Sequence, residues 1–311
     1  MTSSHPLAGV YAAAVTPVHT ASLNGKKSDS TLDLESVPAL LNFLASRGCH
    51  GAVLFGTTGE GPSFSPSERE AVMRAAIAAR SQLPGFRLIA GVGTPSLSET
   101  IDLTKFAFDL GYDAALALPP YYFRNATDDG LFNWFSELIT KAVPSDQYLL
   151  GYHFPRVAGI GFSIELLARL KDAFPTQFAG IKDSSYDADL TRSLGKKFGY
   201  DLVVLTGTDS YVQLAMENKA AGCITAAANI ISPQLRNIWD LMCEGKDASA
   251  AQAHVTELRE ILDKYPPFPP TLKAMLHRLH GLPRWQVKPP LVEITEAMEE
   301  QLAMELAGIK Q

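Results

Sequence analysis

A lysine directly follows a short apolar segment in the run Phe178-Ala179-Gly180-Ile181-Lys182, with Asp183 and two serines behind it. A short apolar run bounded by turn-forming residues is typical of a strand buried on both faces. Lys182 is then at the carboxyl end of a core strand, where an ammonium group is costly to bury. That cost favours the neutral amine, a nucleophile able to form a Schiff base with a carbonyl group. Taken alone, the pattern favours a lysine that points from the strand end into water, with Asp183 as a helix cap, because single lysines after strands are common.

Hydroxyl groups follow two other apolar segments. Gly56-Thr57-Thr58-Gly59 combines two hydroxyls with several backbone N–H groups, a cradle suited to a carboxylate or an oxyanion. Tyr152 lies in another apolar segment, residues 148–154, and a phenol at the end of that segment can relay a proton. An amine, a phenol and a hydroxyl pair together suit carbonyl chemistry through an imine. The alternatives are a tight turn whose threonines only satisfy backbone groups, and a tyrosine that belongs to the core.

Metal and nucleotide chemistry have little support in the sequence. The first apolar segment has no His-x-His pair, and no His-Glu-x-x-His helix is present. Gly91-Val92-Gly93 lacks the third glycine of a dinucleotide-binding fingerprint, and we interpret it as part of a strand. No phosphate-binding P-loop and no nucleophile elbow occur. We therefore expect neither a metal ion nor an organic cofactor.

Apolar periodicity predicts eight short strands that alternate with helices. The strands are expected at residues 10–16, 51–56, 87–93, 114–119, 148–154, 178–182, 203–207 and 223–228. The helices between them are expected at residues 32–47, 66–83, 96–110, 130–142, 163–173, 187–198 and 210–220, the first of them capped at Asp29-Ser30.

Such alternation indicates an α/β fold with parallel strands. Eight units in about 230 residues is the size of a (β/α)₈ TIM barrel. A doubly wound sheet would normally carry a glycine-rich loop after its first strand, and Ala14-Val15-Thr16-Pro17 is not one. In a barrel the carboxyl ends of all strands meet at one mouth, so Lys182, Tyr152 and the threonine pair are expected to converge there.

The pattern changes after residue 231. Helices are predicted at residues 232–244, 248–264, 270–280 and 295–307, with no strand between them. We therefore predict a barrel over residues 1–231 and an appended C-terminal helical region over residues 232–311.

Composition narrows the class of protein. The 311 residues carry a net charge of −6 and no basic run, which argues against nucleic acid and membrane surfaces as partners. No apolar stretch approaches the length of a membrane span, and the first dozen residues do not read as a signal peptide. Three widely spaced cysteines fit reduced thiols. We expect a cytoplasmic protein.

Several separated motifs resemble those of one family in order and spacing. They are GTTGEG from Gly56, PYY from Pro120, YHFP from Tyr152, GIKD from Gly180, and the turns at Gly207 and Asn229. Over most of residues 8–300 the chain resembles the N-acetylneuraminate lyase and dihydrodipicolinate synthase family, which are pyruvate-dependent class I aldolases. The resemblance implies a (β/α)₈ barrel, a homotetramer built as a dimer of dimers, and no metal or organic cofactor.

The resemblance also implies roles for individual residues. Lys182 would form an imine with pyruvate, and Tyr152 would move protons to and from the intermediate. Thr57 and Thr58 would contact the pyruvate carboxylate and relay a proton to the tyrosine, with Thr58 as the catalytic and Thr57 as the substrate-binding member of the pair. Tyr122 would reach into the site of a neighbouring subunit. The expected lining of the pyruvate site also includes Gly56, Gly207 and Ile224.

One departure from the family bears on the substrate. Dihydrodipicolinate synthases carry an arginine after the tyrosine motif that binds the carboxylate of aspartate semialdehyde; here Val157 occupies that position and Arg156 comes one residue early. Losing a bidentate arginine–carboxylate contact disfavours that substrate. The partner expected instead is a 2-keto-3-deoxy sugar acid or a similar 2-oxo acid, or the corresponding aldehyde. The alternatives are dihydrodipicolinate synthase with Arg156 serving the carboxylate, a ketodeoxyglucarate dehydratase, and a non-catalytic keto-acid sensor.

Overall fold

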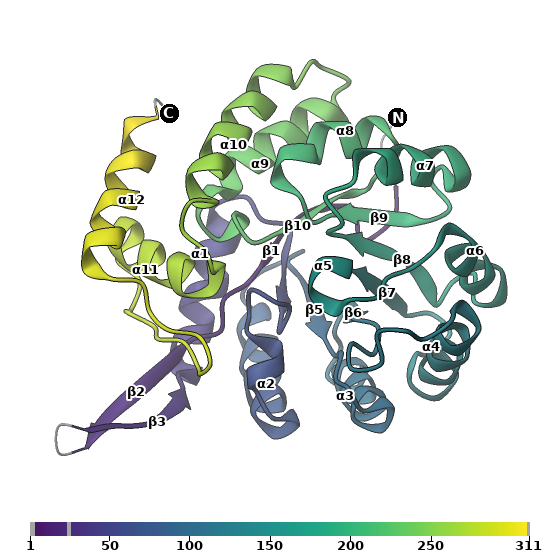
Figure 1. Ribbon diagram of the computed structural model, residues 1–311, viewed down its shortest axis with the longest axis horizontal. Coiled ribbons are helices and arrows are strands. Elements are labelled where there is room, and N and C mark those ends of the chain that lie inside the picture. The colour runs from purple at the N-terminus through teal and green to yellow at the C-terminus, as the bar shows by residue number, and fades with distance from the viewer. Residues whose placement is uncertain (1–3, 24–25, 310–311) are drawn as a thin grey trace.

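Eight parallel strands form a closed barrel in the computed structural model, which describes residues 4–23 and 26–309 (Figure 1). The strands are β1 (Gly9–Ala13), β4 (Gly51–Leu54), β5 (Arg87–Gly91), β6 (Ala114–Ala117), β7 (Tyr148–His153), β8 (Phe178–Asp183), β9 (Val203–Thr206) and β10 (Gly222–Thr225). Each strand pairs with the next barrel strand along the chain, and β10 closes the barrel on β1. The predicted (β/α)₈ class is confirmed.

Helices alternate with the strands and cover the outside of the barrel (Figure 1). They are α1 (Val37–Ser46), α2 (Pro66–Arg80), α3 (Leu97–Asp109), α4 (Asp128–Ala142), α6 (Ile164–Ala173), α7 (Ala188–Phe198), α8 (Val212–Glu217) and α9 (Ala228–Cys243). Side-chain caps explain several starts, because Ser65, Ser96 and Ser163 each accept a hydrogen bond from a backbone N–H in the first turn. Ser65 and Glu68 together form a capping box.

The barrel has two apolar layers, because alternate side chains of a strand point to opposite faces. Tyr11, Val53 and Leu205 belong to the cluster inside the barrel. Their chain neighbours, such as Val10 and Leu54, belong to the larger cluster between the strands and the helices. Both layers are almost fully buried, so the strands form a rigid frame for the side chains at their ends.

The predicted first helix begins too early. Residues before it form an antiparallel hairpin of β2 (Val18–Leu23) and β3 (Lys26–Leu32), so the predicted cap at Asp29-Ser30 lies within a strand. Asp33 caps the short 3₁₀ helix η1 (Leu34–Ser36) instead, and α1 starts only at Val37. The missed signal is the Asn24-Gly25 dipeptide, which favours a two-residue hairpin turn; these two residues lie outside the described ranges.

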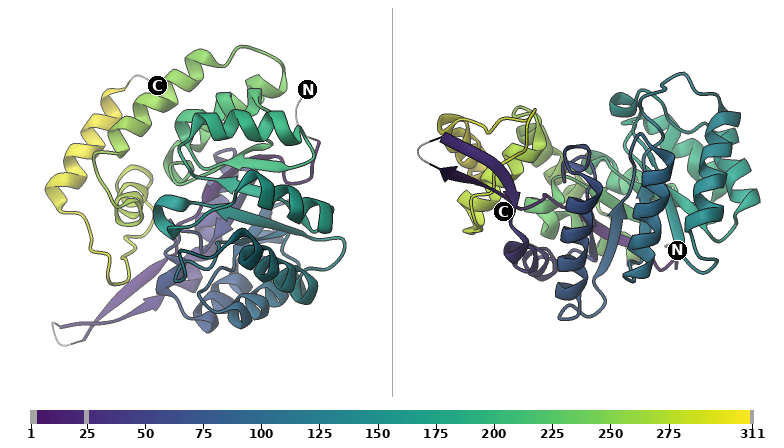
Figure 2. Two further views of the ribbon diagram at one scale, coloured as in Figure 1. Left: turned by 45° about the vertical axis from the view of Figure 1, so that its right-hand side comes forward. Right: turned by 90° about the horizontal axis from the view of Figure 1, so that it is seen from below.

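The C-terminal region consists of α10 (Ser249–Leu262), α11 (Phe268–His280) and α12 (Glu296–Gly308), and no strand occurs within residues 244–309. In Figure 2 the connection between α11 and α12, drawn in yellow, comes next to the purple β2–β3 hairpin. Trp285 donates its indole N–H to Asp33 across 3.1 Å, which ties the segment after α11 to the end of the hairpin. The boundary predicted at residue 231 falls inside α9, where the Ile231 backbone is non-helical, and it stays a prediction.

Within the described residues, no helix combines the length and the apolar composition that a membrane span requires.

A half-buried histidine at the amino end of the barrel should make the free energy of unfolding depend on pH. His50 Nδ1 accepts a hydrogen bond from the Val10 N–H at 2.9 Å, a role that requires an unprotonated nitrogen. Burial lowers the pKa of His50 to about 4, helped by the charges of Arg236 and Arg87. The unfolded chain, with a histidine pKa of about 6.5, then binds more protons than the folded chain below that pH, so stability falls as the pH drops from about 6.5 to about 4.

Urea unfolding at a series of pH values measures this slope. His50→Asn, whose amide oxygen can accept the same hydrogen bond without titrating, should make the slope shallower. An unchanged slope in this variant would contradict the assignment to His50.

Candidate active site

Three polar side chains converge at the carboxyl ends of β4, β7 and β8. Lys182 Nζ lies 3.2 Å from the Tyr152 hydroxyl, and the Thr57 hydroxyl lies 3.3 Å from the same oxygen. Lys182 and Tyr152 are adjacent partners across β7 and β8, and both are at most 5% exposed. The phenol therefore contacts an amine on one side and an alcohol on the other. An arrangement of this kind can carry a proton between solvent-facing Thr57 and a substrate bound at the amine.

Lys182 faces the barrel interior because β8 carries one extra residue. Leu149 pairs with Phe178, whereas the next residue, Leu150, pairs with Gly180. Ala179 and Ile181 would share a face in a regular strand, yet Ala179 lies in the interior cluster and Ile181 in the outer one. This one-residue shift in the alternation of side chains turns Lys182 toward the interior of the barrel. A side chain on Gly180 would meet the Val203 backbone at 1.9 Å, so only glycine fits there.

The turn after β4 presents Thr57. Phe55 and Glu60 both adopt the left-handed backbone conformation with φ of 55°, an uncommon state for residues other than glycine. The turn closes on itself through the Gly61 N–H to Gly56 carbonyl bond of 3.1 Å. The Thr16 hydroxyl from the segment after β1 donates to the Gly59 carbonyl at 2.7 Å.

The two threonines of this turn differ in environment. Thr57 is exposed and hydrogen-bonded to Tyr152, whereas Thr58 is buried with 7% of its surface accessible. The described geometry thus gives the contact with the phenol to Thr57, whereas Thr58 was the member of the pair expected to be catalytic.

Thr57→Val should therefore lower kcat more than Thr58→Val. Valine retains the shape of threonine and removes only the hydroxyl, and loss of a proton relay costs about a hundredfold. Steady-state kinetics of both variants measure the difference. Equal losses, or a larger loss for Thr58→Val, would assign the relay to Thr58.

Two further predicted residues lie close to this centre. Ile224 of β10 is fully buried in the same interior cluster as Tyr152. Gly207 follows β9 and donates its N–H to the Asp183 carbonyl at 2.6 Å. A Cβ at Gly207 would meet the Ser184 hydroxyl at 1.9 Å, so the two loops approach each other closely here.

The aromatic loop after β6 places two neighbouring tyrosines differently. Tyr122 is 77% exposed and its ring packs on Phe123. Tyr121, which sequence reasoning had not singled out, points inward and lines a small cavity. Burial raises the pKa of the Tyr121 phenol. The other residues around this cavity include Phe55, Gly56, Thr57, Pro62, Leu118 and Tyr152.

Arg156 and Val157 lie on α5 (Pro155–Ala158), a single helical turn after β7. Both are exposed, and the Arg156 guanidinium lies 5.3 Å from the centre of the Tyr186 ring. On an extended segment two neighbouring side chains such as these would point to opposite faces. The short helix instead separates them by about 100° around its axis.

A histidine and an aspartate lie behind the reactive pair, one residue further along β7 and β8. His153 pairs with Asp183 in the strand register and accepts the Phe162 N–H on Nδ1 at 2.9 Å. Burial lowers the pKa of His153, opposed by the charge of Asp183, and burial raises the pKa of Asp183. Asp183 also accepts the Ser185 N–H at 3.0 Å. These contacts fix the loops after β7 and β8.

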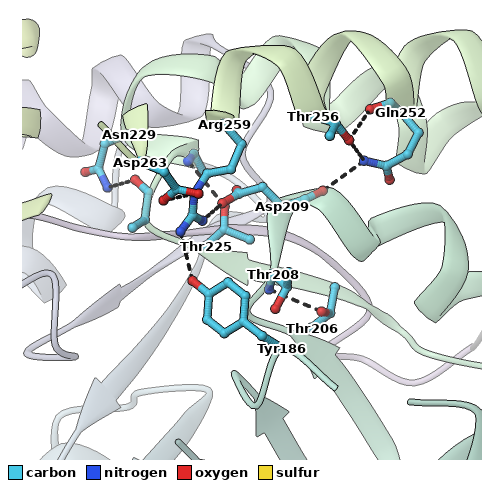
Figure 3. Close-up of polar contacts among 12 residues, drawn as sticks. Tyr186, Thr206, Thr208, Asp209, Thr225, Asn229, Gln252, Thr256, Arg259 and Asp263 are labelled. Atoms are coloured by element: carbon cyan, nitrogen blue, oxygen red, sulfur yellow. Dashed lines mark hydrogen bonds and ion pairs between the residues drawn. The ribbon is translucent and has the colours of Figure 1, made fainter. Parts of the chain in front are cut away.

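A buried ion pair lies next to the carboxyl ends of β9 and β10 (Figure 3). Arg259 of α10 pairs with Asp209, which is fully buried after β9, and donates to the Tyr186 hydroxyl at 2.8 Å. Gln252 donates to the Asp209 carbonyl at 3.0 Å. The C-terminal helix α10 thereby anchors Tyr186, on which Arg156 stacks.

Across residues 4–23 and 26–309, no three His, Cys, Asp or Glu side chains gather closely enough to hold a metal ion.

Comparisons with known proteins identify the family of this chain. The model of the dihydrodipicolinate synthetase family matches residues 6–308. A protein of Chloroflexus aurantiacus described as an uncharacterised DapA-like lyase is 36% identical over 89% of this chain and 90% of its own. The 4-hydroxy-tetrahydrodipicolinate synthase of Thermus thermophilus is 31% identical over 87% of this chain and 89% of its own.

Solved structures show the same relationship. The crystal structure of dihydrodipicolinate synthase from Agrobacterium tumefaciens has a TM-score of 0.84 and 32% identity, and the match covers 97% of this chain and 99% of that one. A sialic acid aldolase from Ruminococcus gnavus, at 19% identity and a TM-score of 0.85, shares the fold. The chain is an enzyme of the lyase class and belongs to the dihydrodipicolinate synthetase family.

Proposed function

We propose that this protein is a class I aldolase that binds pyruvate as an imine on Lys182 and cleaves or forms a 2-keto-3-deoxy sugar acid or a similar 2-oxo acid. The observation that carries the proposal is the buried contact of Lys182 Nζ with the Tyr152 hydroxyl, completed by Thr57. An amine nucleophile next to a hydroxyl that can exchange protons is the equipment that imine chemistry requires.

In the cleavage direction the Lys182 amine attacks the C2 keto group of the substrate, and loss of water leaves an iminium ion. In the dehydration step the Tyr152 phenol gives its proton to the departing hydroxyl group, which leaves as water. The resulting phenolate takes the proton of the C4 hydroxyl, the C3–C4 bond breaks, and the electron pair of that bond moves into the iminium to give an enamine and a free aldehyde. The enamine is protonated at C3 by the Tyr152 hydroxyl, and water then releases pyruvate and the free amine. Thr57 exchanges the proton between Tyr152 and solvent.

The preference for a sugar acid rests on the residues of α5. Val157, at the position where dihydrodipicolinate synthases carry the carboxylate-binding arginine, is 48% exposed and offers no hydrogen bond. The Arg156 guanidinium stacks on Tyr186. Polyhydroxylated aldehydes need hydrogen-bonding groups around the mouth rather than a bidentate carboxylate clamp.

A second candidate is 4-hydroxy-tetrahydrodipicolinate synthase, which would condense pyruvate with aspartate semialdehyde. Its support is the name of relatives that are 30–31% identical over most of their length, together with a charged Arg156 exposed near the mouth. In this reading Arg156 would leave Tyr186 and bind the aldehyde carboxylate.

Two assays decide between these activities. Borohydride reduction in the presence of pyruvate, followed by peptide mass mapping, should place a pyruvyl adduct on Lys182; its absence would refute the imine mechanism. Pyruvate release is then measured over a panel of 2-keto-3-deoxy acids and compared with condensation of pyruvate and aspartate semialdehyde. A kcat/KM for the condensation that equals or exceeds the sugar-acid values would favour the synthase.

We also propose that the enzyme is a homotetramer in which a second copy covers the aromatic loop after β6. Tyr122 and Phe123 are 77% and 67% exposed, an unusual exposure for adjacent large aromatic residues. Sedimentation equilibrium tests the assembly, and a monomer at micromolar concentration would exclude it.

A further inference from the structure

Glu60 is a buried carboxylate within the turn that presents Thr57, and its partners come from the C-terminal region. Its side chain is 0% exposed, and Oε1 lies 2.5 Å from Nζ of Lys273, which belongs to α11 and is 1% exposed. Its other oxygen, Oε2, accepts the backbone N–H of Lys288 at 2.9 Å. Both oxygens are therefore bonded to residues more than two hundred positions away in the chain.

The partners of Glu60 are themselves fixed in place. Lys273 Nζ also donates to the Gln286 carbonyl at 2.6 Å, and the Gln286 N–H donates to the Val18 carbonyl at 2.9 Å. The Lys288 ammonium pairs with Glu68 of α2 and lies 4.5 Å from the centre of the Phe64 ring. The segment between α11 and α12 thus forms a strap that crosses from the hairpin to α2 and covers Glu60.

Glu60 transmits this anchoring to Thr57 through the backbone. The Glu60 N–H donates to the Thr57 carbonyl at 3.1 Å, and Glu60 itself is held in the left-handed conformation. Such a conformation persists in a residue other than glycine only when its surroundings determine it. Fixing the carboxylate therefore fixes the end of the turn from which the Thr57 hydroxyl reaches Tyr152.

A buried arginine of α2 also holds the backbone of this turn. Arg69 of α2 is 3% exposed and donates to the carbonyls of Gly61, Phe64 and Gly93. Arg69 and Thr16 hold the backbone of the turn, whereas the Lys273 contact acts on the Glu60 side chain. A buried ion pair is weak support for stability, because well-packed apolar residues serve that purpose as well or better. In this protein the buried Glu60–Lys273 ion pair instead fixes the position of the turn.

We propose that the Glu60–Lys273 ion pair is a positioning device through which the C-terminal helical region sets the Thr57 hydroxyl against Tyr152. This inference rests on the proposed function for its effect on catalysis and deepens it by naming two positioning residues remote from the reacting atoms. Because a displacement of about 1 Å in a reacting group can cost about a hundredfold in rate, loosening the turn should lower kcat while leaving imine formation at Lys182 in place.

The test uses Lys273→Met together with Glu60→Gln/Lys273→Met. The single variant leaves a buried carboxylate without its cation and could fail to fold, whereas the double variant leaves no uncompensated charge and keeps the packing. Lys264→Met is the matched control, since Lys264 forms a 2.9 Å ion pair with Glu305 that links the turn after α10 to α12 without touching the turn that presents Thr57.

Two readouts are measured on the full-length enzyme. Exchange of the pyruvate methyl protons with D₂O, followed by NMR, reports proton transfer without an aldehyde partner; it should fall about ten- to a hundredfold in the double variant with a nearly unchanged KM for pyruvate. Backbone amide exchange in the peptide spanning residues 56–61 should accelerate at least about tenfold in the same variant, since fewer contacts hold the turn. Lys264→Met should match the wild type in both.

The possible results distinguish failure of the positioning role from failure of the proposed aldolase activity. Wild-type pyruvate exchange in a folded double variant, with unchanged protection of the turn, overturns the positioning role. If the wild-type enzyme itself exchanges no pyruvate protons and forms no adduct, the proposed function fails. The amide exchange of the turn then still decides whether Lys273 holds it.

Discussion

Replacing Lys182 with arginine should abolish the pyruvyl adduct after borohydride reduction and lower kcat/KM by about a thousandfold or more. Arginine keeps the positive charge, but its guanidinium stays protonated and cannot act as the imine-forming nucleophile. Removing a covalent nucleophile is among the most damaging changes an enzyme can suffer. The measurement is adduct mass together with steady-state pyruvate release.

The matched control is Lys105→Arg. Lys105 is an exposed lysine of α3 on the outer face of the barrel, and the change there should leave both readouts unaltered. A Lys182→Arg enzyme that retains more than about a tenth of wild-type kcat/KM would show that the reaction does not pass through an imine at this residue.

Tyr152→Phe should lower kcat by about a hundred- to ten-thousandfold, the contribution typical of a general acid–base group. The substitution removes one oxygen and with it both hydrogen bonds, to Lys182 and to Thr57. The ring itself stays, so its stacking on Phe154 and the interior packing are preserved. Rapid-quench kinetics should show that proton transfer and carbon–carbon cleavage slow together.

The comparison with Lys182→Arg separates the two roles. Tyr152→Phe should still give the pyruvyl adduct on Lys182, formed more slowly, whereas Lys182→Arg should give none. Loss of the adduct in Tyr152→Phe with an intact fold by circular dichroism would mean that the phenol is required for the imine itself. Wild-type turnover in this variant would remove Tyr152 from the mechanism.

The barrel could be predicted because its signal is local and repeated. Each strand is a short apolar run, each helix carries its own period and cap, and eight repeats of about 30 residues leave few architectures open. The hairpin before α1 was missed for the converse reason. Its strands are polar, and a polar run without apolar alternation gives little periodicity to read.

The sequence by itself determined which residue types stand at the strand ends: a lysine on β8, a tyrosine on β7 and two threonines after β4. These positions can be read from the sequence because each apolar run predicts a strand, and the polar residues that follow the run mark the end of that strand. The tertiary structure decided which of them meet. The extra residue at Ala179 turns Lys182 toward the interior, and the strand pairing then brings its Nζ to Tyr152.

The tertiary structure also decided between Thr57 and Thr58 and recruited Glu60 and Lys273 to the turn. Neighbouring residues of the same type are equivalent in sequence, but the folded turn leaves Thr57 exposed beside Tyr152 and buries Thr58. The physical reason is that a side chain's direction depends on register, backbone conformation and long-range contacts, none of which is encoded in a local pattern.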